Sequence, residues 1–262
     1  MMRNLMITIA YKGTAYRGFQ VQKNLPTVCA AFQDAVETVF GTRYDIKGCS
    51  RTDSGVHARG FVLSLKCRET IPCDNIIRAL NVNLPMDIVV LDCREAPEDF
   101  HPRYDSVGKR YLYRIWNSRE RNPFEEGLAL HVPRPLDLER MNDAARRLEG
   151  TWDYSAFCSA GDSVEDHVRT VYRCRAAREG NLITLSVTGD GFLYNMVRII
   201  TGTLLEVCAG RRQPEEMEPL LLSRDRTLAG KTASPWGLYL DRVFYSREEL
   251  TQALMEEARG KA

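Results

Sequence analysis

The sequence of 262 residues lacks a strong charge excess and lacks a long hydrophobic run. Its 36 basic side chains nearly balance its 35 acidic ones, which neither indicates nor excludes a nucleic-acid partner, because such binding needs only a local basic surface. The longest apolar run, residues 192–205, is interrupted by polar residues and is shorter than the ~20 residues that span a bilayer. The N-terminus has no signal-peptide core. We therefore expect a cytoplasmic protein without a membrane partner.

Metal-binding and nucleotide-binding motifs are also missing. The eight cysteines form no C-x-x-C pair and there are only four histidines, so we expect no metal site. Most cysteines lie in apolar segments, which is typical of reduced, buried thiols. Residues 189–191 begin like a dinucleotide loop but lack its third glycine, and residues 230–232 end like a phosphate-binding loop but lack its first. These absences argue against a nucleotide-dependent enzyme.

The residues that are present indicate a globular α+β protein. With 44% hydrophobic residues, the chain can bury a core. The hydrophobic pattern predicts strand, helix, strand, strand, helix and strand at residues 4–11, 28–40, 44–49, 61–67, 74–80 and 87–93. The same order recurs at residues 109–117, 136–148, 170–177, 182–188, 192–208 and 236–245. This βαββαβ order is that of ferredoxin-like domains.

The two repeats define the expected domains. We expect an N-terminal domain at residues 1–105, a C-terminal domain at residues 106–246 and a tail helix at residues 247–262. Thr27 is expected to cap the first helix. Ser246 and Glu249 form a capping box at the start of the tail helix.

A polar loop between two predicted strands, residues 49–58, carries a candidate catalytic carboxylate. Asp53 begins an Asp-Ser-Gly sequence that favours a tight turn, and in an arbitrary loop such an aspartate most often bonds only its own turn. Arg51 lies two residues earlier, and Arg198 lies in an apolar predicted helix where burial is costly without an anion. In one interpretation, Arg198 reaches the surface or bonds a carbonyl. In the other, it pairs with Asp53 and keeps this carboxylate ionised as a nucleophile or base.

Two basic clusters are further candidates for RNA contact. Their members are Arg103, Lys109, Arg110 and Arg114 in one, and Arg169, Arg173, Arg175 and Arg178 in the other. Each cluster by itself fits an RNA-binding surface and a solvated strand face equally well.

Collinear blocks around the loop are more specific. Ser50–Ala58 is similar to a G-R-T-D-x-G-V-H-A signature, with Ser50 in place of the glycine. Six further blocks match at Tyr11–Gln22, Leu80–Pro85, Asp99–Arg103, Lys109–Ile115, Phe192–Gly202 and Gly237–Leu240. Together these blocks, over about residues 5–245, resemble the TruA family of tRNA pseudouridine synthases. Lys12 and Phe61 depart from the family pattern, as Ser50 does.

This resemblance implies a fold and an activity. It implies two ferredoxin-like units that form an extended mixed or antiparallel sheet, with helices on one side and the active site in a cleft between the units. It implies a homodimer that needs neither a metal nor an organic cofactor. The implied partner is tRNA, in which uridines at tRNA positions 38, 39 and 40 of the anticodon arm become pseudouridine.

The resemblance also assigns roles by position. Asp53 is expected to be the catalytic residue, and Tyr111 is expected to pack on the target base. Arg198 is expected to pair with Asp53. Arg51 is expected to hold the RNA backbone or to help the base leave the stack. Leu238, in the closing Gly-Leu-Tyr-Leu block, is expected to bind substrate.

Three alternatives stay open. A non-catalytic RNA-binding protein with paired RRM-like units would stack bases on central strands and would not need Asp53. A structural or chaperone protein could hold RNA between the units. A synthase could also act on other uridines, because the departures at Ser50, Lys12 and Phe61 lie near the loop. The presence of Asp53, Tyr111 and Arg198 favours an enzyme.

Overall fold

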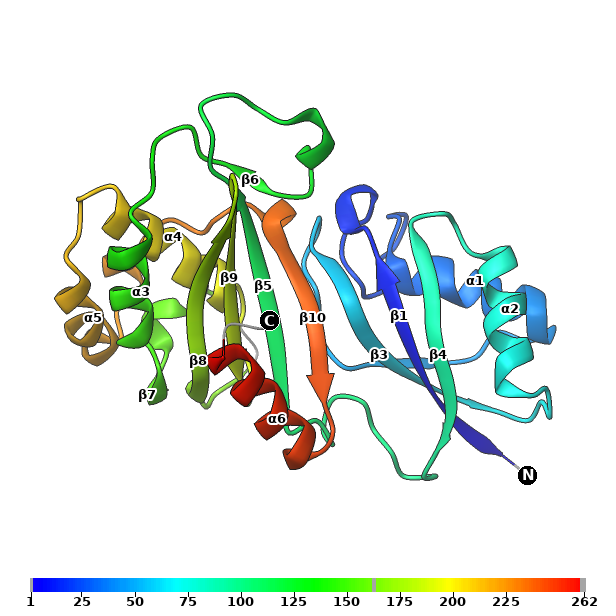
Figure 1. The fold of residues 1–262 in the computed structure, drawn as a ribbon. Coiled ribbons are helices and arrows are strands. Elements are labelled where there is room, and N and C mark those ends of the chain that lie inside the picture. Colours follow the sequence, from blue (N-terminus) through cyan, green and yellow to red (C-terminus); the bar gives the residue numbers. More distant parts are fainter. Residues whose placement is uncertain (1, 162–163, 260–262) are drawn as a thin grey trace. The chain divides into compact units, whose positions relative to one another are not determined.

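The computed structural model describes residues 2–161 and 164–259, and the chain divides into two compact units (Figure 1). Unit 1 comprises Met1–Val107 and Tyr239–Ser246, and unit 2 comprises Gly108–Leu238 and Arg247–Ala262. This division differs from the expected domains at two segments. The strand at the end of the expected second domain groups with unit 1, and the tail helix groups with unit 2.

The described residues of unit 1 form a sheet of five strands and two α-helices. They are β1 (Arg3–Tyr11), α1 (Val28–Phe40), β2 (Ile46–Gly48), β3 (His57–Cys67), α2 (Cys73–Asn83), β4 (Ile88–Ala96) and β10 (Leu238–Phe244). Strand β1 is antiparallel to both β3 and β4, while β2 is antiparallel to β3 and β10 is parallel to it. The first six elements follow the predicted order and lie close to the predicted places, although β3 begins at His57 rather than at Phe61.

Alternation along the strands builds the core of unit 1. Leu5, Ile7 and Ile9 on β1 are fully buried, as are Phe32 on α1 and Ile76 on α2. The expected cap of α1 is confirmed, because the Thr27 hydroxyl accepts a hydrogen bond from the Ala30 amide at 3.3 Å. Helix α1 ends at Gly41, whose φ of 70° suits glycine.

The described residues of unit 2 form five strands and four α-helices. Its elements are β5 (Gly108–Trp116), β6 (Leu130–His131), α3 (Leu138–Arg146), β7 (Gly150–Asp153), β8 (Val168–Glu179), β9 (Leu182–Gly189), α4 (Met196–Cys208), α5 (Met217–Ser223) and α6 (Arg247–Ala258). The strand order is β5-β9-β8-β7, all antiparallel, with β6 parallel to β5. The predicted hairpin of β8 and β9 is confirmed, whereas β6, β7 and α5 were not predicted.

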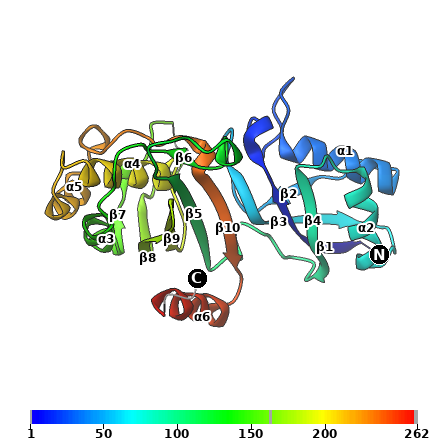
Figure 2. The ribbon, with the colours of Figure 1, turned by 45° about the horizontal axis from the view of Figure 1, so that its top comes forward.

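Helices cover both faces of the unit 2 sheet (Figure 2). Tyr113 on β5 and Val187 on β9 are fully buried on the face that α3 and α4 cover. On the other face, the buried Glu257 of α6 accepts hydrogen bonds from Arg110, Ser186 and Thr188 at 3.2, 3.1 and 3.3 Å. The expectation that helices lie on one side is therefore wrong for unit 2, because this polar strand face binds a carboxylate on the tail helix.

The expected α+β class is confirmed, and so is the burial of most cysteines. Six of the eight cysteines are buried, as their apolar surroundings predicted. Within residues 2–161 and 164–259, none of the helices is both long and apolar enough to cross a membrane.

Candidate active site

The loop that carries Asp53 lies in unit 1 between β2 and β3. Asp53 is half-buried, and its carbonyl accepts a hydrogen bond from the Val56 amide at 3.1 Å. Ser54 and Gly55 occupy the centre of this turn, where Gly55 has a φ of 80°. The predicted Asp-Ser-Gly turn is therefore confirmed, and its third residue adopts the left-handed backbone that glycine tolerates best.

The N-terminal segment, residues 11–19, holds this loop through main-chain contacts. The Phe19 amide donates to the Thr52 carbonyl at 3.2 Å, and the Gly55 amide donates to the Tyr16 carbonyl at 3.2 Å. The buried hydroxyls of Thr52 and Tyr11 are hydrogen-bonded to each other at 2.7 Å. Residues on both sides of Asp53 are thus tied to one neighbouring segment, which fixes the main chain of the loop.

Two glycines in that segment permit the close approach. A Cβ atom on Gly13 would overlap the Val56 carbonyl oxygen, and a Cβ atom on Gly18 would lie 2.6 Å from the Thr52 carbonyl oxygen. Gly18 also has a φ of 95°. Larger residues at either position would push the N-terminal segment away from the Asp53 loop.

Tyr16 anchors the segment from the other side. Its hydroxyl donates to Asp87 Oδ1 at 2.7 Å. Burial raises the pKa of Tyr16 above its ordinary value, and the neighbouring Asp87 carboxylate raises it further. The phenol therefore stays protonated and keeps donating this hydrogen bond at neutral pH.

His57 is a supporting residue to which the sequence analysis assigned no role. It is 1% exposed, and its Nδ1 accepts a hydrogen bond from the Gly13 amide at 3.0 Å. Its ring stacks on Tyr239 of β10 at a centroid distance of 4.5 Å, and the Arg59 guanidinium lies 5.3 Å from the Tyr239 ring. The signal was present in the sequence, since His57 and Tyr239 both fall in the collinear blocks.

Tyr111 lies on β5 of unit 2, on the same face as Tyr113. It is 7% exposed, and its ring meets Phe192 edge to face, at 5.0 Å and 80°. Tyr113 is fully buried and donates its hydroxyl proton to the Ser234 carbonyl at 2.7 Å. Burial raises the pKa of Tyr113, although nearby Arg198 opposes the shift. Tyr113 is thus a structural residue.

Arg198 lies in the first turn of α4. Its Nε donates to the Ala233 carbonyl at 2.8 Å, and its guanidinium donates to Asn195 Oδ1 at 2.6 Å. The bond to a carbonyl is one of the two alternatives from the sequence, while the pairing with Asp53 stays a prediction. Helix α4 begins at Met196 rather than at Phe192, because Asn195 has a left-handed backbone with a φ of 62°.

The segment 233–238 connects the candidate residues of unit 2. Its consecutive carbonyls at Ala233 and Ser234 accept hydrogen bonds from Arg198 and Tyr113. Leu238 follows in the same segment and is 6% exposed. Unit 2 thus holds three of the predicted site residues, Tyr111, Arg198 and Leu238. Unit 1 holds the other two, Asp53 and the exposed Arg51.

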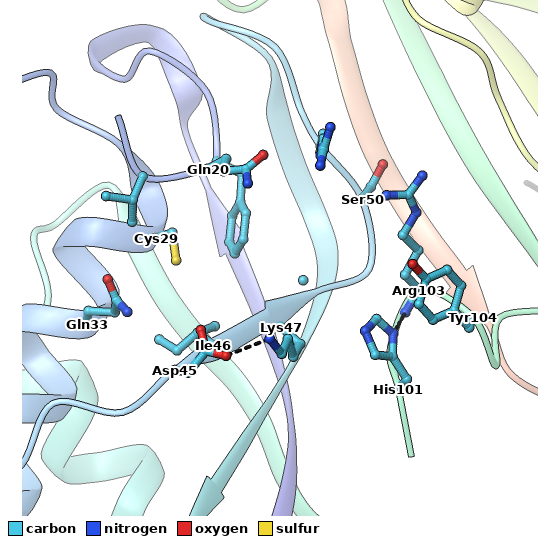
Figure 3. A pocket seen from close by; sticks show the side chains of 14 residues that line it. Gln20, Cys29, Gln33, Asp45, Ile46, Lys47, Ser50, His101, Arg103 and Tyr104 are labelled. Atoms are coloured by element: carbon cyan, nitrogen blue, oxygen red, sulfur yellow. Dashed lines mark hydrogen bonds and ion pairs between the residues drawn. The ribbon is translucent and has the colours of Figure 1, made fainter. Parts of the chain in front are cut away.

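A pocket of about 350 Å³ opens beside the Asp53 loop, wholly within unit 1 (Figure 3). Ser50 and Arg51 of the loop line it, together with residues that follow β4 and residues of β2 and α1. Across the described ranges, no group of three or more His, Cys, Asp or Glu side chains is placed to hold a metal ion.

Comparisons with known proteins identify the family of the chain. The family model described as tRNA pseudouridine synthase matches residues 7–105 and 144–246. The chain is 41% identical to tRNA pseudouridine synthase A of Geobacillus kaustophilus, over 98% of this chain and 100% of that protein. It is 44% identical to tRNA pseudouridine synthase A of Acetivibrio thermocellus, over 93% of this chain and 100% of that protein.

Solved structures were also matched, among them one at low similarity. A chain in the crystal structure of a Cbf5-Nop10-Gar1 complex aligns at 10% identity and a TM-score of 0.34, over 90% of this chain and 57% of that one. No argument rests on this similarity. The family model and the near-full-length relatives are sufficient: the chain belongs to the tRNA pseudouridine synthase family.

Proposed function

We propose that this protein isomerises uridine to pseudouridine in tRNA and that Asp53 is its catalytic residue. The observation that carries the proposal is the Asp53 loop itself. A half-buried carboxylate, two residues after an exposed arginine, is held in place by main-chain contacts on both sides. Such rigid support is what a group needs when it must meet one atom of a bound nucleotide.

The reaction conserves all atoms of the nucleotide. The N1–C1′ bond breaks, the uracil ring turns, and a C5–C1′ bond forms. The proton on C5 then leaves to a base, and N1 gains a proton. An ionised Asp53 can begin this sequence by attack on C1′ or on C6 of uracil, or by removal of a ribose proton. The target base must first leave the helical stack.

The other site residues are proposed to bind and orient the substrate. Tyr111 would pack on the uracil ring and could accept the C5 proton. Arg198, fixed by the Ala233 carbonyl and by Asn195, would pair with Asp53 and keep it ionised. Arg51 would hold the RNA backbone, and Leu238 would contact the extruded nucleotide.

The finer features of the proposal concern the substrate and the assembly. We place the target uridines at positions 38, 39 and 40 of the anticodon arm. We also propose two ferredoxin-like units that share one extended sheet, with the substrate in a cleft between them. The protein would act as a homodimer in the cytoplasm and would need no metal or organic cofactor.

Release of tritium from C5 of uridine tests this function. Anticodon-arm tRNA labelled at C5 is incubated with the native protein, with Asp53→Asn and with Asp92→Asn, all in the presence of EDTA. Asp92 is an exposed aspartate on β4 of the same unit and serves as the matched control. We expect release by the native protein and by Asp92→Asn, and no release by Asp53→Asn.

Other outcomes identify the alternatives. A protein that binds the tRNA tightly but releases no tritium from it or from labelled total RNA is a binding protein. Release from total RNA but not from the anticodon arm indicates a synthase that acts on other uridines. Activity of Asp53→Asn close to the native value refutes the assignment of Asp53.

A further inference from the structure

The pocket beside the Asp53 loop has no role in the function proposed so far. Three parts of unit 1 form it: the segment after β4, the turn before α1 with α1 itself, and β2 with the start of the Asp53 loop (Figure 3). Ser50 and Arg51 line the pocket and lie only three and two residues before Asp53. A ligand in this pocket would therefore contact the loop that carries Asp53.

The charge of the pocket favours an anion. Arg51 and Arg103 are both exposed, and neither forms an ion pair with a carboxylate within residues 2–161 and 164–259. The third cation, Lys47, is already paired with Asp45 at 2.6 Å. Two guanidinium groups without a carboxylate partner at one pocket match the charge of a phosphate group.

An exposed aromatic side chain lies on the same wall. Tyr104 is 75% exposed, which is unusual for a ring of its size, yet its neighbours constrain it. The His101 ring lies 4.4 Å from the Tyr104 ring, and the Arg103 guanidinium lies 5.9 Å from it. The turn itself is closed by hydrogen bonds from the His101 amide to Asp105 and from the Arg103 amide to His101 Nδ1. A fixed, exposed ring of this kind suits a base that stacks on it.

The size of the pocket fits one nucleotide. A volume of about 350 Å³ lies at the lower end of the range for small-ligand pockets, ~300–1,000 Å³. Gly48 lets the Phe19 and Phe61 rings pack directly against the main chain at the pocket. A Cβ atom at this position would lie 2.7 Å from Phe19 and 2.9 Å from Phe61. The amide of Gln20 also lines the pocket and makes no hydrogen bond within the described parts of the chain, so it is available to a base edge.

We propose that this pocket binds a second, unpaired nucleotide of the RNA, next to the target uridine. Its base stacks on Tyr104 and its phosphate lies between Arg103 and Arg51. This proposal rests on the proposed function, because it places the second nucleotide relative to the uridine at Asp53. It assigns Tyr104 and Arg103 to substrate binding, and it predicts that the enzyme grips the nucleotide beside its target as well as the target.

A fluorescent base tests the stacking. 2-Aminopurine is placed on the 5′ side or on the 3′ side of the target uridine in an anticodon-arm RNA. We expect its fluorescence to fall when the native protein binds one of these two RNAs, and to fall equally with Tyr104→Phe. With Tyr104→Ala the change should be lost, and KM for tritium release should rise about tenfold while kcat changes less than threefold.

A salt titration tests the phosphate contact. Arg103→Gln should reduce the slope of log affinity against log salt concentration by about one, since one phosphate contact is lost. Arg68→Gln is the matched control, because Arg68 is an exposed arginine of unit 1 outside the pocket. It should leave the slope and KM unchanged.

The outcomes separate this proposal from the proposed function. In one outcome, the native protein releases tritium, Tyr104→Ala behaves like its control Tyr104→Phe, and Arg103→Gln behaves like its control Arg68→Gln. The pocket proposal is then overturned and the proposed function stands. If these variants lose affinity for uridine 5′-monophosphate but keep the native kinetics on RNA, the pocket takes a free nucleotide and the proposal is again overturned. If the native protein releases tritium from no RNA, the proposed function and this proposal fail together.

Discussion

The two units support their candidate site residues in different ways. In unit 1, Asp53 lies on a loop, and the main chain of residues 11–19 holds that loop by hydrogen bonds and by contacts that only glycine allows. In unit 2, Tyr111 and Arg198 lie on a strand and a helix, and their own side chains make the contacts that orient them.

This difference determines which substitutions should matter. Support by main chain depends on backbone approach, so it should tolerate many side-chain changes but fail when a methyl group is added at a glycine. Support by side chains depends on particular donor groups, so conservative replacements should disturb it even where the backbone is unchanged. The predictions below test this contrast.

The largest effect is expected for Gly13→Ala. The added methyl group would overlap the Val56 carbonyl, so residues 11–19 must move away from the Asp53 loop. Because a misplacement of about 1 Å costs roughly a hundredfold in rate, single-turnover tritium release should fall at least about a hundredfold. Far-ultraviolet circular dichroism should show that the variant remains folded.

Gly41→Ala is the control for Gly13→Ala. Gly41 ends α1 with a φ of 70° and has open space around it, so alanine there introduces backbone strain but touches nothing. It should lower the free energy of unfolding by about 1 kcal/mol without lowering the rate. Equal losses of rate in the two variants would mean that general destabilisation, and not the loop contact, explains the effect.

Local pattern was sufficient for most regular elements. The alternation of β1, the Thr27 cap of α1 and the hairpin of β8 and β9 depend on neighbours in sequence, and each was predicted. The pairing of β10 with β3 and the packing of α6 through Glu257 depend on segments far apart in sequence. The local hydrophobic period of a segment does not show which distant segment it will contact. The expected domain bounds and the expectation of helices on one side of the sheet therefore differ from the structure at β10 and α6.

The candidate site divides in the same way. The Asp53 turn was predictable because Asp-Ser-Gly has a strong local preference. The roles of Gly13, Gly18 and His57 were not, because they arise where two backbone segments approach each other. The start of α4 was misplaced because helical periodicity does not reveal that Asn195 adopts a left-handed backbone.

Arg198→Lys should have the next largest effect. A lysine offers one compact ammonium group and cannot bond both the Ala233 carbonyl and Asn195 in the geometry of a guanidinium. We expect kcat for tritium release to fall about tenfold. Arg140→Lys is the matched control, because Arg140 also bonds a carbonyl and an amide oxygen, at Arg212 and Gln213, and should keep the native rate. A native rate for Arg198→Lys would contradict side-chain support in unit 2.

Tyr113→Phe should reduce stability more than activity. It removes the hydrogen bond to the Ser234 carbonyl in a fully buried position, which should lower the free energy of unfolding by about 1–2 kcal/mol in urea denaturation. The rate should fall only a few-fold, since segment 233–238 is still held by Arg198. Tyr172→Phe, at a 36% exposed tyrosine of the same unit, should change neither quantity. A large loss of rate with unchanged stability would assign Tyr113 a direct part in the reaction.

The smallest effect compares one thiol from each unit. Burial raises the pKa of Cys29 in unit 1 and of Cys208 in unit 2 from an ordinary 9.0 to about 11, with Asp45 and Asp137 adding to the shift. Each thiol therefore keeps its proton to higher pH in the folded chain than in the unfolded chain. Its contribution to stability is complete below about pH 9 and is lost as the pH rises to about 11. In the native protein, the free energy of unfolding should therefore decline between about pH 9 and pH 11, as measured by urea denaturation. Cys29→Ala and Cys208→Ala should each make this decline smaller, and by a similar amount. If only one of the two variants made the decline smaller, burial would raise the pKa of the two thiols unequally.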